Sequence, residues 1–93
     1  MSNLSVRVKI EGLVQGVWFR GWTVKLATEL CLSGWVRNRK DGSVEAIFCG
    51  DKTSVEEIIK LIYKGPEAAS VVSVNVKYED INVGAGFKQL PTL

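Results

Sequence analysis

The hydrophobic period of this chain switches repeatedly between two and 3.6 residues, and the order of the switches constrains the fold. Apolar and polar residues alternate over residues 4–10, which is typical of a half-buried strand. Over residues 22–32 the apolar residues follow a helical period, with Trp22, Leu26 and Leu30 in one row. The chain is therefore predicted to begin with a strand, a loop and a helix.

A β-hairpin is predicted to follow this helix. Ser33-Gly34 ends the helix, and Gly34 is the expected left-handed cap. Residues 35–39 and 43–49 alternate as strands do, and Lys40-Asp41-Gly42 joins them as a turn, because Asp-Gly accepts a positive φ.

A second helix and two strands are predicted for the remainder of the chain. Thr53 and Glu56 match a capping box at the start of the helix, and Lys64-Gly65-Pro66 ends it. Residues 72–78 alternate again, and residues 86–90 are expected to form a short edge strand. The apolar stripe of the helix consists of Val55, Ile58, Ile59 and Ile62.

The predicted order is βαββαβ with a short extra strand. Two helices on one face of an antiparallel sheet make the ferredoxin-like α+β sandwich. In this topology the first two strands run parallel, with the third between them, so their carboxyl ends lie at one edge of the sheet. Asn38, near the end of the second strand, is then expected on the helix-covered face beside the loop that follows the first strand.

That loop, residues 12–21, contains three glycines and one arginine, Arg20. A loop that ends at a helix N-terminus offers free backbone N–H groups and a partial positive charge. A guanidinium at the same place can form paired hydrogen bonds to phosphate oxygens. The loop is therefore a predicted phosphate cradle.

Composition excludes several kinds of chemistry. The chain has no histidine, which removes Ser-His-Asp and Cys-His nucleophile systems and the commonest metal ligand. A net charge of +2 is too small a basic excess to indicate a nucleic-acid partner. No apolar run approaches the roughly 20 residues of a membrane span, and a signal-peptide pattern is lacking at the N-terminus. We expect a cytoplasmic protein without membrane or nucleic-acid partners.

Cys31 and Cys49 match no metal or redox spacing, and buried free thiols are the favoured interpretation.

Two motifs at the right separation resemble the acylphosphatase family. The first is Gly12-Leu13-Val14-Gln15-Gly16-Val17-Trp18-Phe19-Arg20, and the second is Gly34-Trp35-Val36-Arg37-Asn38, followed by Gly42-Ser43-Val44 and Gly50. The similarity covers nearly the whole chain, and we expect residues 1–93 to form a single acylphosphatase-like domain. Trp18 and Gly21 depart from the family pattern, where many members have a smaller and a bulkier residue, respectively.

The resemblance implies a hydrolase that cleaves the carboxyl–phosphate bond of acyl phosphates without a metal or an organic cofactor. Arg20 matches the phosphate-binding arginine, and Asn38 matches the asparagine that positions the attacking water. Inorganic phosphate is then the product and a competitive inhibitor, and we expect a monomer. The backbone amides that match the family's phosphate cradle are those of Gln15, Gly16, Val17, Trp18, Phe19 and Arg20.

The absence of histidine agrees with this chemistry. An acyl phosphate releases a carboxylate whose conjugate acid has a pKa of about 4, so no general acid is needed at neutral pH. Phosphoryl transfer depends mainly on positioning and on charge stabilisation. Arg20 and Asn38 can supply both.

Alternative interpretations remain at this point. If Arg20 is considered alone, the simplest interpretation is a solvated arginine at the start of a helix. If Asn38 is considered alone, the simplest interpretation is that it stabilises the turn before Asp41-Gly42. The fold also suits an RNA-binding module, which needs aromatic residues on the exposed face of the sheet. The third strand is instead expected to expose Glu45, Ile47 and Cys49 on that face, which argues against this alternative. A regulatory module that binds an anion through the same loop, and a domain detached from a larger maturation enzyme, are the other two possibilities.

Overall fold

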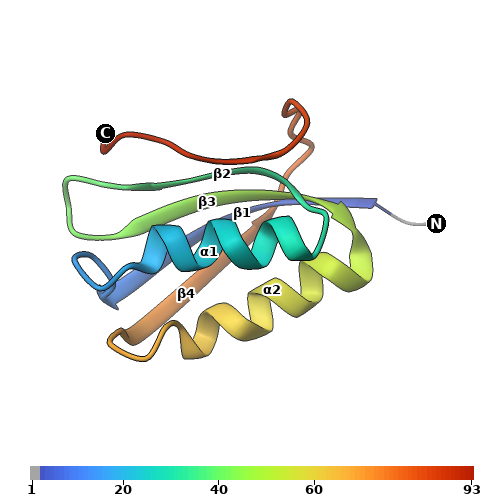
Figure 1. Ribbon diagram of the computed structural model, residues 1–93. Helices are drawn as coiled ribbons and strands as arrows, with labels where there is room; N and C mark the ends of the chain where they lie inside the picture. The colour runs from blue at the N-terminus through green and yellow to red at the C-terminus, as the bar shows by residue number, and fades with distance from the viewer. Residues whose placement is uncertain (1–2) are drawn as a thin grey trace.

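A five-stranded β-sheet carries two helices on one face (Figure 1). The computed structural model describes residues 3–93. The strand order is β4-β1-β3-β2-β5, which confirms the predicted ferredoxin-like βαββαβ sandwich with a short extra strand. The elements are β1 (Asn3–Leu13), α1 (Phe19–Glu29), β2 (Ser33–Asn38), β3 (Val44–Asp51), α2 (Lys52–Lys64), β4 (Ser70–Tyr78) and β5 (Phe87–Gln89).

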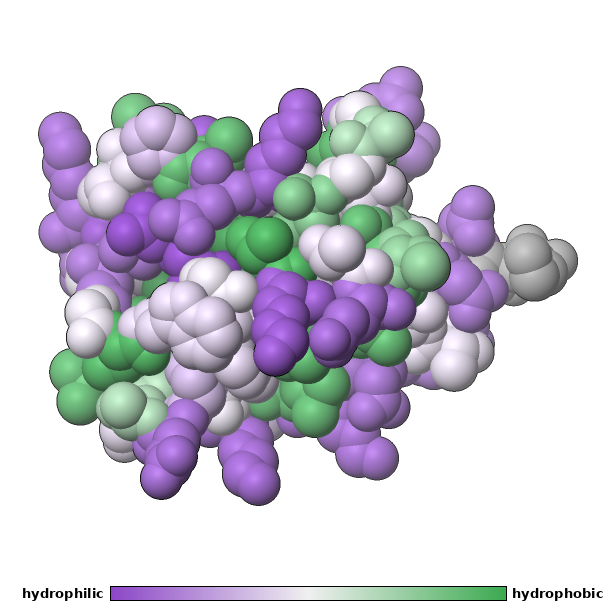
Figure 2. Space-filling view, in the orientation of Figure 1, coloured by the Kyte–Doolittle hydropathy of each residue, from purple (hydrophilic) through white to green (hydrophobic). Residues whose placement is uncertain are grey.

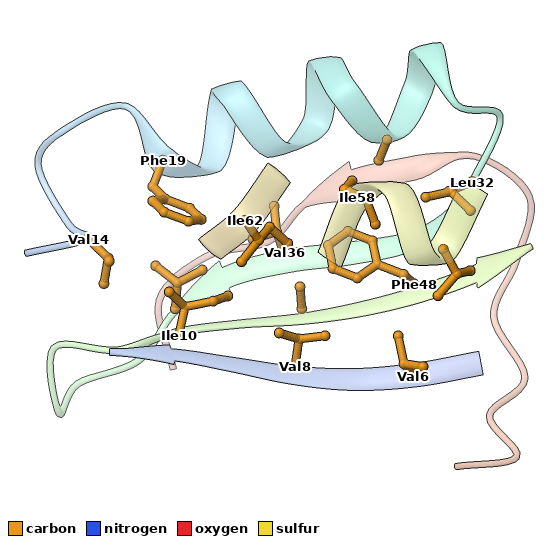
Figure 3. Close-up of a cluster of buried hydrophobic side chains, with 14 residues drawn as sticks. Val6, Val8, Ile10, Val14, Phe19, Leu32, Val36, Phe48, Ile58 and Ile62 are labelled. Atoms are coloured by element: carbon orange, nitrogen blue, oxygen red, sulfur yellow. The ribbon is translucent and has the colours of Figure 1, made fainter. Parts of the chain in front are cut away.

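Alternation places the apolar residues of the strands against the helices. Val6, Val8 and Ile10 of β1 are completely buried, and they pair in register with the equally buried Phe48, Ala46 and Val44 of β3. The predicted stripe of α2 covers them from one side, as Figure 3 shows for Ile58 and Ile62. The core therefore lies between the sheet and both helices, and the charged side chains of β1 and β3 face the other way.

The last strand makes the sheet mixed rather than purely antiparallel, because β5 runs parallel to β2. The connection over residues 79–86 leaves β4 at one edge and reaches β5 at the opposite edge, so it crosses the open face of the sheet. On the way, the carbonyl oxygen of Ile81 accepts hydrogen bonds from Ser5 Oγ (3.4 Å) and Cys49 Sγ (3.8 Å). Ile47, expected on the exposed face, is only 1% exposed and lies on the side of β3 that this connection crosses.

A bulge sets the start of the loop between β1 and α1. β1 continues past its predicted end, and Gly12 and Leu13 pair with Val71 and Ser70 of β4. The register shifts between Glu11 and Gly12, so the regular alternation predicted for β4 fails there. As a result Val71 packs against the core, whereas its neighbour Val72 is 78% exposed.

The first helix begins at Phe19, three residues before the predicted start at Trp22. Its completely buried face consists of Phe19, Thr23 and Ala27, and the predicted row of Trp22, Leu26 and Leu30 is only partly buried beside it. Thr23 satisfies its hydroxyl by donating to the carbonyl oxygen of Phe19 at 2.8 Å. The earlier start places Arg20 inside the first helical turn rather than in a loop.

The second helix keeps its predicted stripe but has a different cap. Asp51 is the N-cap, and its side chain accepts a hydrogen bond from the backbone N–H of Thr53 at 3.1 Å. The predicted capping box at Thr53 and Glu56 is wrong, because the helix has already begun at Lys52.

The end of α1 was also predicted wrongly, because the residue whose positive φ ends the helix is Cys31, whereas the positive φ of Gly34 (135°) belongs to a strand residue. Cys31 has φ 59°, and Gly34 lies within β2. The N–H of Cys31 donates to Thr28 (3.0 Å) and that of Leu32 to Ala27 (2.9 Å), which is a Schellman motif. Cys31 is exposed and Cys49 is partly exposed, so neither is the buried thiol that the sequence favoured.

We expect Cys31→Gly to stabilise the protein by about 0.5–1 kcal/mol, because glycine adopts the left-handed conformation without the Cβ clash. For a domain of this size, that change raises the melting temperature by roughly 2–8 °C in a calorimetric scan. Cys31→Ala is the matched control, since it removes the thiol but keeps the Cβ, and it should bring no such gain. Equal stabilisation by both substitutions would assign the effect to the thiol instead.

Candidate active site

A pocket of about 170 Å³ opens where the β1–α1 loop meets the end of β2. It joins the loop and the first turn of α1 to Asn38 on β2 and to Gln89 on β5. Of the predicted site residues, only Val17 is missing from the lining, and it packs against the hydrophobic core instead. The lining residues are Val14, Gln15, Gly16, Trp18, Phe19, Arg20, Gly21, Asn38 and Gln89.

The loop backbone has the geometry of an anion-binding turn. Gly16 and Trp18 both have left-handed φ values, 73° and 65°, and Val17 between them does not. Alternation of this kind turns successive N–H groups towards one concave side. Trp18 is also the N-cap of α1 and forms no side-chain capping bond, so the first N–H groups of the helix have no intrahelical acceptor.

Arg20 adds a full positive charge to this helix end. The ion pairs found within residues 3–93 involve Arg7, Lys9 and Arg39, and none involves Arg20. The first turn of α1 contains no acidic residue that could offset the charge. A cation at a helix N-terminus is electrostatically unfavourable by itself, so this arrangement is suited to a bound anion.

Asn38 lines the same pocket from the end of β2. It is the last residue of β2, is only 9% exposed, and shares the buried face of the strand with Val36, as predicted. Within residues 3–93 its side-chain amide makes no hydrogen bond, whereas its backbone oxygen accepts one from Leu93 at 3.1 Å. The Asn38 amide is not among the buried polar atoms that lack a partner, which in the described residues are limited to Arg37 Nε, so it is open to a water or a ligand in the pocket.

Asp41, not Asn38, stabilises the β2–β3 turn. One carboxylate oxygen of Asp41 accepts from the Ser43 backbone N–H (2.9 Å) and from the Ser43 hydroxyl (2.6 Å). These bonds from Ser43, together with nearby Lys9, hold the pKa of Asp41 well below its usual value. Asp41 therefore already stabilises the turn, which was the alternative role considered for Asn38.

Gln15 connects the two halves of the pocket through its side chain, which the sequence reasoning missed. Its amide nitrogen donates to the carbonyl oxygens of Arg39 (2.8 Å) and Ser43 (2.9 Å), on either side of the turn. These bonds tie the loop to the hairpin that carries Asn38. Only the backbone amide of Gln15 was predicted to matter, and nothing in the sequence places those two carbonyls within its reach.

A second hollow, of about 280 Å³, lies on the charged open face of the sheet. Its charges are largely paired with each other, as in Arg7–Glu45 (2.7 Å) and Lys9–Asp41 (3.1 Å). Figure 2 shows the opposite, helix-covered side, where hydrophobic residues form separate patches among hydrophilic ones. The pocket at Arg20 and Asn38, with its unpaired polar groups, is therefore the stronger site candidate.

The described residues also lack two other kinds of feature. No helix within residues 3–93 is long and apolar enough to cross a membrane. The same residues contain no cluster of three or more His, Cys, Asp or Glu side chains arranged to hold a metal ion.

Comparison with known proteins gives consistent matches over nearly the whole chain. The family model described as Acylphosphatase matches residues 6–89. The acylphosphatase of Rhizorhabdus wittichii is 51% identical over 92 residues, which cover 99% of this chain and 93% of that protein. The acylphosphatase of Rhodospirillum rubrum is 48% identical over 86 residues, 92% of this chain and 94% of the relative. The structure of an acylphosphatase from Coxiella burnetii superposes with a TM-score of 0.91 at 34% identity, covering 95% and 93% of the two chains.

Proposed function

Because the chain belongs to the acylphosphatase family, and is thus a hydrolase that acts on acid anhydrides, we propose that Arg20 and Asn38 are its catalytic residues. The observation that carries this proposal is that both side chains line one pocket and that neither has an intramolecular partner within residues 3–93. Arg20 binds the phosphate of an acyl phosphate, and Asn38 positions the water that attacks it.

The phosphate is held from the α1 side of the pocket. The planar guanidinium of Arg20 forms two parallel hydrogen bonds to phosphate oxygens, a geometry that lysine cannot reproduce. Backbone N–H groups of residues 15–20 bind the remaining oxygens, and the positive end of α1 adds to the attraction. The left-handed backbone at Gly16 and Trp18 supports this role.

The water attacks from the Asn38 side. The amide oxygen of Asn38 accepts one hydrogen bond from the water and so holds its oxygen towards the phosphorus atom. As the new P–O bond forms, the bond from phosphorus to the acyl oxygen breaks, and its electron pair leaves on the carboxylate. The water proton passes to a phosphate oxygen, so the products are a carboxylate and inorganic phosphate.

This reaction suits a site without histidine. The leaving carboxylate has a conjugate acid with a pKa of about 4, so it needs no proton at neutral pH. We also propose that residues 1–93 act as one catalytic domain and as a monomer, because this chain by itself supplies both Arg20 and Asn38 to the pocket and the proposed reaction needs no residue of a second subunit.

The test is an assay of benzoyl phosphate hydrolysis with and without a chelator. We expect hydrolysis that EDTA leaves unchanged and that inorganic phosphate inhibits competitively. Phenyl phosphate is the control substrate, because its leaving phenol has a pKa near 10, as tyrosine has, and needs a general acid that the site does not contain. Phosphate binding without turnover of any acyl phosphate would instead support a non-catalytic anion-binding module.

A further inference from the structure

The pocket is too small to enclose a whole acyl phosphate with a large acyl group. Its volume of about 170 Å³ lies below the roughly 300–1,000 Å³ of pockets that bury drug-sized ligands. Among the lining residues Val14, Phe19 and Asn38 are buried, whereas Gly16, Trp18 and Gln89 are exposed. With the phosphate bound at the buried part, the acyl group must extend past the exposed residues.

Trp18 is the large side chain at this opening. The residue is 63% exposed, although an aromatic side chain of this size usually packs against protein. The ring lies directly against Gly21, in the first turn of α1, where an added Cβ would collide with the indole nitrogen. Glycine inside a helix is destabilising relative to alanine, and the position of the indole gives a reason for glycine here.

The charges of the lining residues restrict which acyl group fits. Arg20 is the sole cationic residue in the lining, and the phosphate engages it; no lining residue is acidic. A second negative charge on the acyl group would therefore find no further cation among the lining residues. The exposed indole and the amide of Gln89 suit an uncharged acyl group with a flat apolar surface.

We propose that Trp18, seated on Gly21, is a specificity residue that favours aromatic or extended apolar acyl phosphates over acetyl phosphate. This selectivity presupposes the proposed hydrolysis at Arg20 and Asn38 and names the substrate class for that site. The aromatic acyl group stacks on the indole while the phosphate stays in the loop, so the contact also fixes the direction of the leaving group.

The decisive quantity is kcat/KM for benzoyl phosphate divided by kcat/KM for acetyl phosphate. We expect Trp18→Ala to lower this ratio about three- to tenfold, the effect of losing one aromatic contact, and Trp18→Phe to retain most of it. Comparing ratios cancels the different intrinsic reactivities of the two substrates and any distortion of the loop that affects both. The control Tyr63→Ala removes the aromatic ring of a similarly exposed residue from α2 and should leave the ratio unchanged.

Gly21→Ala gives an independent test through the same contact. The new methyl group displaces the indole, so Gly21→Ala should lower the benzoyl-to-acetyl ratio of kcat/KM when Trp18 is present. In a protein that already carries Trp18→Ala, adding Gly21→Ala should leave this ratio unchanged. A ratio that neither variant changes, while both substrates are still hydrolysed, would overturn the role of Trp18. A ratio that rises in Trp18→Ala would overturn it too, because the indole would then obstruct the acyl group. A wild-type protein that hydrolyses neither substrate would contradict the proposed function itself.

Discussion

Replacing Arg20 with alanine should weaken the binding of inorganic phosphate by roughly 10²- to 10⁴-fold and abolish measurable hydrolysis of acyl phosphates. The substitution removes two charge-assisted hydrogen bonds, each worth about 1.5–3 kcal/mol. Arg20 has no ion pair within residues 3–93, so its loss leaves no acidic side chain unpaired, and the fold should persist. Isothermal titration with phosphate measures the first effect, and an acyl phosphate assay measures the second.

Two further variants separate charge from geometry at this position. Arg20→Lys keeps the charge but loses the paired hydrogen bonds, so we expect partial recovery of phosphate binding and little recovery of turnover. Arg7→Ala removes one positive charge from the open face of the sheet, where Arg7 pairs with Glu45, and should leave phosphate affinity unchanged. Wild-type phosphate affinity in Arg20→Ala would exclude Arg20 from the phosphate site.

Replacing Asn38 with alanine should have a different signature, a fall in kcat of roughly 10²- to 10³-fold with phosphate affinity nearly unchanged. This is the typical effect of removing one preorganised polar group that acts in the transition state. The Asn38 side chain makes no hydrogen bond within residues 3–93, so its truncation exposes no new unsatisfied partner in the fold. Steady-state kinetics with benzoyl phosphate and a phosphate titration measure the two quantities.

Asn75 provides the matched control for Asn38. It is also a strand asparagine, but it is exposed on β4 and does not line the site pocket. Asn75→Ala should keep wild-type kcat. If Asn38→Ala also keeps nearly wild-type kcat, the water is positioned by another group.

The features that the sequence predicted well depend on local patterns. Alternation predicted the buried faces of β1 and β3, and Asp41-Gly42 predicted the hairpin turn. The placement of Arg20 and Asn38 in one pocket followed from topology alone, because the βαββαβ order brings the carboxyl ends of β1 and β2 to the same end of the sheet. Their catalytic roles remain predictions.

The features that were missed depend on contacts between distant parts of the chain. Cys31 takes a left-handed conformation that propensity assigns to glycine, in the short connection between the end of α1 at Glu29 and the start of β2 at Ser33. Ile47 is buried on the face of the sheet that a connection from β4 to β5 crosses, and Val72 is exposed at a bulge in the pairing of β4 with β1. The reach of Gln15 to the β2–β3 turn is likewise visible only once the strands are assembled.

The pairing that anchors the entry of the phosphate loop has a consequence for folding kinetics. Gly12 and Leu13 are held by Val71 and Ser70, which lie 59 and 57 residues further along the chain, respectively. Closing so long a segment carries a high entropic cost, and folds that depend on such distant pairs assemble slowly. During synthesis, a nascent chain that has completed α1 still lacks the strand that fixes this loop. Phosphate should therefore have no affinity for early folding intermediates, so the ligand slows unfolding without accelerating the first collapse.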